Sequence, residues 1–203
     1  GVRGHVVESR SSAWKLSALL GFYRWLRLEK RMDYDPMANI ETTESWKVLP
    51  KSLAEGEVGE MLERTGAAAR AADADSLTLR DHAILELLYA GGLRVGEICS
   101  LGVEDLHLDQ ARAQVRGKGD KERIVPLGRS AVGALERYLS LGRTGLVRRG
   151  TLSRALFLSV RGRALTRQWV WEMVRSASAI GAKASPHMLR HSCATHMVEH
   201  GAD

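Results

Sequence analysis

The chain has 203 residues, of which 44% are hydrophobic and 27% are charged. This is the composition of an ordinary globular protein, and it excludes wholesale disorder, collagen-like repeats and a membrane-embedded bundle. Two cysteines, Cys99 and Cys193, are too few for a disulfide framework and indicate a reducing compartment. No apolar run is long enough to span a membrane, so we expect a cytoplasmic protein.

The positive charge is concentrated in one part of the chain. Lys and Arg number 30 against 24 Asp and Glu, a net charge of +6. Between Ala111 and Arg175, however, 15 basic residues face 4 acidic ones, a net of +11, while the rest carries −5. Such asymmetry is typical of a surface that faces a polyanion, most often nucleic acid. Charge alone leaves open that these arginines are only solvated faces of amphipathic elements.

The first part of the chain predicts one helix and a linker. Apolar side chains recur at helical spacing over residues 12–31, and Ser11 or Ser12 can cap the helix start. Residues 32–50 lose this periodicity and contain two prolines, which indicates a linker between domains. We therefore expect residues 1–47 to be the end of a helical domain plus linker, and residues 48–203 to form a second domain.

The second domain predicts helices, then a hairpin, then helices again. A capping-box pattern from Ser52 to Glu55 opens a helix to about residue 65, and residues 66–75 either extend it or form a loop. Alternation on both sides of Gly117–Asp120 predicts a β-hairpin over residues 111–127. A brief strand is expected at residues 156–158. The other expected helices are residues 77–90, 94–100, 130–141 and 166–179, the last of these capped by Thr166, and one that Ser185 caps and Pro186 opens. The fold class is thus mainly α with a small antiparallel hairpin or sheet (α+β).

Four cationic or imidazole side chains could meet in this fold: Arg94, Lys118, His187 and Arg190. Arg94 starts a helix after two glycines, Lys118 lies at the hairpin tip, and His187 and Arg190 share one helix face. Such a group suits a phosphate whose charge grows in a transition state. Each residue also has a plain alternative as a surface ion pair, a solvated turn residue or a helix cap.

Three sequence blocks resemble the main motif blocks of the tyrosine site-specific recombinases (the phage integrase family), in that family's order and spacing. They are residues 92–101 (GLRVGEICSL), 117–127 (GKGDKERIVPL) and 187–196 (HMLRHSCATH). The resemblance covers residues 48–203 and is nearest to the Xer-like or integrase branch. Residues 22–26 (FYRWL) resemble the end of the family's helical, SAM-like core-binding domain.

The resemblance implies a role for each site residue. Arg94 and Arg190 would bind the non-bridging oxygens of the scissile phosphate, and Lys118 would protonate the leaving 5′-oxygen. His187 would hydrogen-bond the phosphate and help to deprotonate the nucleophile. Glu97 and His191 would support the site, and the residues expected to bind DNA are Arg116, Lys121 and Arg123.

The implied reaction is DNA breaking and rejoining through a 3′-phosphotyrosine, without a cofactor or metal. The implied partner is double-stranded DNA, on which the protein assembles as a tetramer with itself or with a paralogous recombinase. Integration, excision and chromosome or plasmid dimer resolution are all compatible with this chemistry. No membrane partner is expected.

The nucleophile that the resemblance calls for is not found among the tyrosines of this chain. In the family it lies downstream of the His-x-x-Arg helix, whereas the tyrosines here are Tyr23, Tyr34, Tyr89 and Tyr138. We therefore expect a fragment that binds DNA without cleaving it. The alternatives are a non-catalytic DNA-binding relative and a type IB topoisomerase-like enzyme. A zinc site on the histidine pairs 187/191 or 196/200 is disfavoured, because the Glu of an H-E-x-x-H motif is absent.

Overall fold

The computed structural model describes residues 9–32, 36, 52–117, 121–148, 153–178 and 184–201, with the side chains of 9–17 and 24 excepted. The chain divides into two compact units, Gly1–Leu49 and Pro50–Asp203. None of the described helices is both long enough and apolar enough to cross a bilayer.

The first unit contains the helix α1, Ser9–Leu28. It begins and ends three residues earlier than the sequence predicted. It stops at Leu28 because Lys30 takes a left-handed conformation with φ of 53°, which lets the Arg31 N–H bond the Leu26 carbonyl. Most of the expected linker lies outside the described residues.

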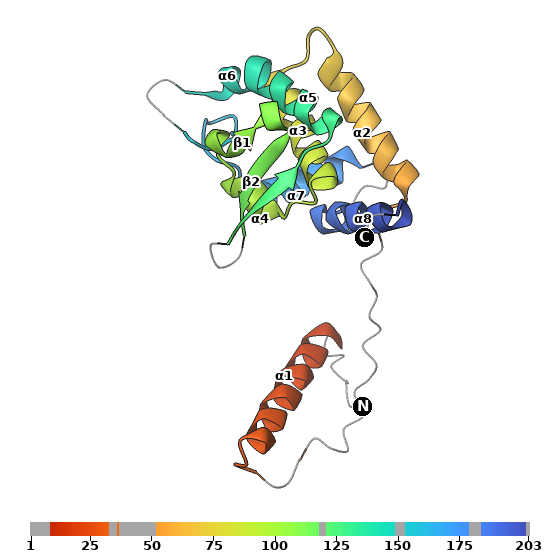
Figure 1. The fold of residues 1–203 in the computed structure, drawn as a ribbon, viewed down its shortest axis with the longest axis vertical. Helices are drawn as coiled ribbons and strands as arrows, with labels where there is room; N and C mark the ends of the chain where they lie inside the picture. The colour runs from red at the N-terminus through yellow and green to blue at the C-terminus, as the bar shows by residue number, and fades with distance from the viewer. Residues whose placement is uncertain are drawn as a thin grey trace, which may run out of the picture. The chain divides into compact units, whose positions relative to one another are not determined.

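The second unit is a helical domain with one small sheet (Figure 1). Its principal elements are α2 (Glu55–Arg70), α3 (Ser76–Ala90), α4 (Val95–Ser100), β1 (Leu106–His107), β2 (Arg112–Arg116), β3 (Glu122–Pro126), α5 (Arg129–Arg137), α6 (Arg143–Leu146), α7 (Arg167–Ala177) and α8 (Pro186–Glu199). The expected α+β class, mainly helical, is confirmed.

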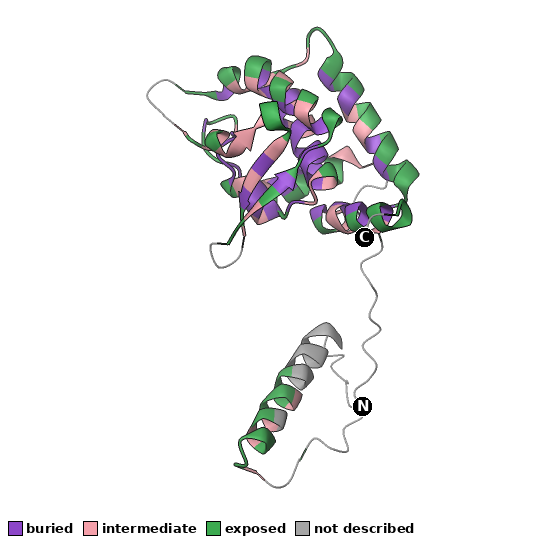
Figure 2. Ribbon diagram, viewed as in Figure 1, coloured by how far each residue is buried: buried purple, intermediate pink, exposed green. Residues whose placement is uncertain are grey.

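Helix α3 forms the centre of this domain, and α2, α5 and α8 pack around it. Its apolar residues point in every direction, so the helix is stable only where neighbours cover all its sides. Six of them are buried: Leu79, Ala83, Ile84, Leu85, Leu87 and Leu88. Figure 2 shows this helix and the middle of β2 as the most buried parts of the domain. The Asp75 carboxylate caps α3 by accepting a hydrogen bond of 2.7 Å from the Thr78 N–H.

The sheet is antiparallel in the order β1-β2-β3. The predicted hairpin is present as β2 and β3, with Ala113 opposite Val125 and Val115 opposite Arg123. Ala113 and Val115 are buried against the helices, whereas Ile124 points to the exposed face. The two-residue strand β1 has no sequence signal of its own.

Helix α2 corrects the expected start of this domain. Ser52 does not cap it, because the helix begins at Glu55 and the Ala54 N–H donates to the Glu57 carboxylate at 2.8 Å. The Leu53 N–H instead donates to the Ser192 hydroxyl at 2.7 Å, which ties this segment to α8. The Ala-rich stretch extends the helix to Arg70.

Two other predictions were wrong in detail. The helix expected over residues 130–141 is α5 followed by a π-helical turn, Tyr138–Gly142. The buried Tyr138, at the start of this turn, donates its hydroxyl hydrogen to the Leu156 carbonyl at 3.1 Å. The strand expected at residues 156–158 consists only of isolated bridges, Gly102–Ala155 and Leu158–Ala164. Both depend on contacts between distant segments.

The starts of the last two helices agree with the sequence. The Thr166 hydroxyl accepts a hydrogen bond from the Trp169 N–H, and the Ser185 hydroxyl accepts one from the Met188 N–H, each at 3.2 Å. Pro186 occupies the first turn of α8, where it needs no N–H partner. The Ser185 cap fixes where α8 begins, and with it the positions of His187 and Arg190 on the first turns of that helix.

Candidate functional site

The first site residue, Arg94, lies at the corner between α3 and α4. The corner needs Gly92, whose φ of +53° is a conformation that other residues rarely adopt. Arg94 precedes α4, and its backbone N–H donates to Glu97 Oε2 at 2.8 Å. Its Nη1 also donates to Glu97 Oε1 at 3.0 Å, while its side chain remains 56% exposed. The guanidinium is thus held on one side and open to solvent on the other.

Glu97 is the hub of the site, with only 4% of its side chain exposed. Arg123 from β3 binds it with both terminal nitrogens, Nη1 to Oε1 at 2.8 Å and Nη2 to Oε2 at 3.0 Å. Burial by itself raises the pKa of this carboxyl, but the hydrogen bonds from Arg123 and Arg94 outweigh it and lower the pKa to about 2. Glu97 is therefore ionised at neutral pH.

Arg190 enters the same cluster from α8. Its Nη1 donates to the Gly92 carbonyl at 2.7 Å and lies 4.0 Å from Glu97 Oε2. Burial, together with the nearby charge of Arg94, lowers the pKa of Arg190 below its usual value. Three guanidinium groups thus surround one carboxylate, which leaves an excess of positive charge at this point.

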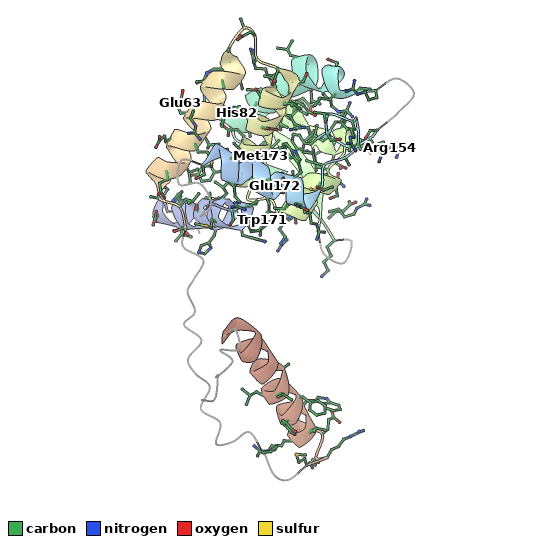
Figure 3. The ribbon with its side chains drawn as sticks, turned by 180° about the vertical axis from the view of Figure 1, so that it is seen from behind. Glu63, His82, Arg154, Trp171, Glu172 and Met173 are labelled. Carbon is green, nitrogen blue, oxygen red and sulfur yellow. The ribbon has the colours of Figure 1, made fainter. Side chains whose placement is uncertain are left out.

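A groove of about 640 Å³ opens beside the cluster. His187 lines it from the first turn of α8, with its ring edge against Trp171 of α7 at a centroid distance of 5.8 Å. Figure 3 shows Trp171 on α7, beside α8. The charged and aromatic residues of the lining are Arg94, Glu97, Arg116, Arg167, Trp171 and His187.

Arg167 and Trp171 are groove residues that sequence reasoning missed. Arg167 is the first residue of α7, and its guanidinium lies over Gly96, where an added Cβ would come within 3.1 Å of its Nη2. The cap at Thr166 signals where α7 begins. No local signal, however, shows that this helix faces α4.

The remaining predicted residues take different places. Lys118 lies outside the described residues, although the neighbouring Gly117 lines the groove. Arg116 lines it too and pairs with Glu122 at 3.0 Å, while Lys121 is exposed where β3 begins. His191 is half-buried on α8 and does not line the groove.

Three of the four histidines that are disfavoured as metal ligands have other side-chain contacts. The His196 Nδ1 and the Tyr89 hydroxyl lie 3.0 Å apart, which turns this ring toward α3. The His200 Nδ1 donates to the His196 carbonyl at 2.7 Å. Within the described ranges, no three His, Cys, Asp or Glu side chains come close enough together to hold a metal ion.

The chemistry of this arrangement favours an anion. Arginine binds phosphate through two parallel N–H donors, and the exposed part of Arg94 leaves such donors free to face the groove. The imidazole of His187 can donate to or accept from an oxygen in the same groove. One buried carboxylate orients the cations without neutralising all of them.

The chain matches known proteins over most of its length. Residues 54–203 match the phage integrase family. The tyrosine recombinase XerD of Pseudomonas aeruginosa is 45% identical over 199 residues, which cover 97% of this chain and 64% of that protein. That of Listeria monocytogenes serotype 4b is 41% identical, over 97% of this chain and 65% of its own length. The chain thus spans less than two thirds of these relatives.

A solved structure supports the fold assignment. The crystal structure of XerA recombinase aligns with a TM-score of 0.64 and 34% identity, covering 76% of this chain and 53% of that one.

Proposed function

We propose a function from the premise that this chain belongs to the phage integrase family: it is part of a site-specific DNA recombinase that breaks and rejoins DNA. The complete protein acts through a 3′-phosphotyrosine intermediate. The XerD proteins, more than 40% identical to this chain, are named as tyrosine recombinases, which supports the same reaction class. The duplex substrate is supported by the XerH site-specific recombinase, whose structure is a complex with its difH substrate.

The observation that carries this proposal is the arginine cluster on Glu97. Arg94 and Arg190 come from segments far apart in the sequence and lie against the same buried carboxylate. The Nη1 of Arg94 is 3.0 Å from Glu97 Oε1, and the Nη1 of Arg190 is 4.0 Å from Glu97 Oε2. Two guanidinium groups at one point can stabilise the charge of a pentacoordinate phosphate transition state. A protein that only binds DNA does not require this convergence.

The other residues complete the proposed mechanism. His187 contributes a hydrogen bond to the scissile phosphate from the side of the groove. Lys118 supplies the proton to the leaving 5′-oxygen, a task that suits a flexible ammonium group. Arg116 and Lys121 bind the DNA backbone beside the scissile site. The described geometry supports the place of His187, whereas the part given to Lys118 rests on the family resemblance.

The 203-residue chain itself binds DNA without cleaving it in this proposal. The family nucleophile lies downstream of the helix that carries Arg190, and no tyrosine of this chain follows Tyr138. The test is incubation with a nicked suicide substrate, in which a cleaved strand is trapped on the protein. A covalent protein–DNA adduct formed by the 203-residue chain would overturn this part of the proposal.

The proposal extends to domains and assembly. Residues 1–47 are the C-terminal part of a helical core-binding domain plus linker, and residues 48–203 belong to the catalytic domain. The complete protein assembles as a tetramer on DNA, with itself or with a paralogous recombinase, and acts in the cytoplasm.

DNA binding by charge-matched variants tests the site. Arg94→Ala and Arg190→Ala should each weaken the binding of a fluorescein-labelled duplex by about tenfold at moderate salt. Arg129→Ala is the control, because it removes the same charge from an exposed position at the start of α5, outside the groove. Equal losses in all three variants would mean that the protein binds DNA only through its overall charge.

A further inference from the structure

We propose that Arg123 is a positioning residue, which acts through Glu97 to keep Arg94 and Arg190 available for the phosphate. This inference rests on the proposed function, in which those two arginines bind the scissile phosphate. It gives Arg123 a role other than the direct DNA contact that the sequence suggested.

The register of the hairpin directs Arg123 inward. Arg123 lies opposite Val115 in the β2–β3 ladder, and residues opposite each other share one face of a sheet. Val115 is fully buried, so this face is the one that packs against the domain, and β2 contacts α4 there. The next residue, Ile124, points to the exposed face. Arg123 is therefore placed against the helix that carries Glu97.

The contact that results uses the whole fork of Arg123. Its two terminal nitrogens bind the two carboxylate oxygens of Glu97 at 2.8 and 3.0 Å, the strongest geometry for such a pair. Arg94 makes a single side-chain hydrogen bond to Glu97, and Arg190 stands at 4.0 Å. Of the three cations, Arg123 is the one committed to the carboxylate.

The commitment of Arg123 to Glu97 matters because the carboxylate and the phosphate compete for the N–H donors of Arg94 and Arg190. A buried carboxylate is costly unless its charge is paired and its oxygens are hydrogen-bonded. Without Arg123, we therefore expect Glu97 to accept a second side-chain hydrogen bond from Arg94 or to attract Arg190 to a shorter distance. Each such bond takes a donor away from the phosphate and brings a negative charge nearer to it. Arg123 prevents this by satisfying Glu97 from the side of the sheet.

A double-mutant cycle separates this role from direct contact with DNA. Binding of the same fluorescein-labelled duplex is measured for the wild type, Arg123→Ala, Glu97→Gln and the double variant. We expect Arg123→Ala to weaken binding about tenfold when Glu97 is present and less than about twofold when residue 97 is Gln, since a neutral amide competes weakly. A similar loss in both backgrounds would show that Arg123 contacts DNA itself, and no loss in either would show that it has no role.

A spectroscopic readout follows the arginines directly. Side-chain ¹⁵N resonances of Arg94 and Arg190 are recorded while inorganic phosphate is added. In the wild type both should shift on titration, and in Arg123→Ala the Arg94 resonance should start displaced and respond less. If the Arg94 resonance of Arg123→Ala has the same starting position and the same response to phosphate as in the wild type, the proposal is wrong.

Two further variants separate a failure of the role of Arg123 from a failure of folding or of the proposed function. Arg123→Lys keeps the charge but lacks the two-pronged fork, so it should bind the duplex with an intermediate affinity and provides the comparison if Arg123→Ala does not fold. Arg94→Ala tests the proposed function separately. If it binds DNA as tightly as the wild type, the proposed function fails; if it binds weakly but the cycle shows no coupling, only the role of Arg123 fails.

Discussion

Arg190 on α8 donates a hydrogen bond of 2.7 Å to the carbonyl of Gly92, 98 residues away in the turn that follows α3. This bond joins two of the three motif blocks, because the same turn leads directly to Arg94. The corner of Gly92 thus sets both the place of Arg94 and the orientation of Arg190.

The first prediction concerns this corner. Gly92→Ala should lower the free energy of unfolding by about 1 kcal/mol or more, because alanine is strained at a φ of +53°. DNA binding should also weaken, since the Gly92 carbonyl would shift from Arg190. Thermal unfolding and duplex binding measure the two effects.

Gly133→Ala is the matched control for this variant. Gly133 lies inside α5, and a Cβ added there meets no atom within 4 Å. Alanine should therefore stabilise the helix by up to about 1 kcal/mol and leave DNA binding unchanged. If Gly92→Ala proved as stable as Gly133→Ala, the conformational argument would be wrong.

The second prediction concerns acid stability. The pKa of Glu97 is lowered from 4.5 to about 2 in the folded protein, so the unfolded chain binds its proton more readily. The stability that Glu97 contributes is present above pH 4.5 and is lost as the pH falls toward about 2. The loss amounts to at most about 3 kcal/mol.

Urea unfolding at a series of acidic pH values checks this prediction. Glu97→Gln removes the titrating group, so its stability should change less over this pH range than that of the wild type. Parallel pH profiles for the two proteins would show that Glu97 does not couple folding to protonation.

The third prediction concerns a buried pair between α2 and α3. Burial lowers the pKa of His82 and so favours its neutral ring. The Thr65 hydroxyl donates to the Met61 carbonyl, so in this neutral ring Nδ1–H donates to Thr65 at 3.1 Å and Nε2 carries no proton. This Nε2 lies 3.8 Å from the Glu86 carboxyl, whose pKa is raised by burial. His82 is shown on α3 in Figure 3.

Glu86→Gln should therefore stabilise the protein at neutral pH by about 1 kcal/mol. A raised carboxyl pKa gives stability that is present below the unfolded value and is lost as the pH rises through the folded value. The glutamine variant has no such loss. Glu60→Gln, at an exposed position of α2, is the control and should change stability little. A destabilised Glu86→Gln at neutral pH would show that the carboxylate is needed there.

The fourth prediction concerns the groove residue Arg167. If it contacts the DNA backbone, Arg167→Ala should reduce the slope of log affinity against log salt by about 1, because one fewer counterion is released. Duplex binding at several salt concentrations measures the slope. Arg129→Ala should leave the slope unchanged, and an unchanged slope for Arg167→Ala would place Arg167 away from the phosphates.

The sequence by itself determined most of the helices, the hairpin and the family. Thr166 and Ser185 capped their helices as expected, because a hydroxyl beside free N–H groups acts within a single turn. The β2–β3 hairpin followed from the alternation of apolar and polar residues on either side of a glycine-rich tip. The three motif blocks identified the family because each is contiguous in the sequence and they follow one another in the family's order and spacing.

Only the tertiary structure decided how the site is assembled. Nothing near Arg123 shows that its guanidinium binds Glu97, since this depends on the register of β3 and on the packing of β2 against α4. The inclusion of Arg167 and Trp171 in the groove likewise depends on how α7 packs against α4 and α8. Burial and long-range contacts are properties of the whole fold, so they select the partner of each charged side chain where local pattern offers several.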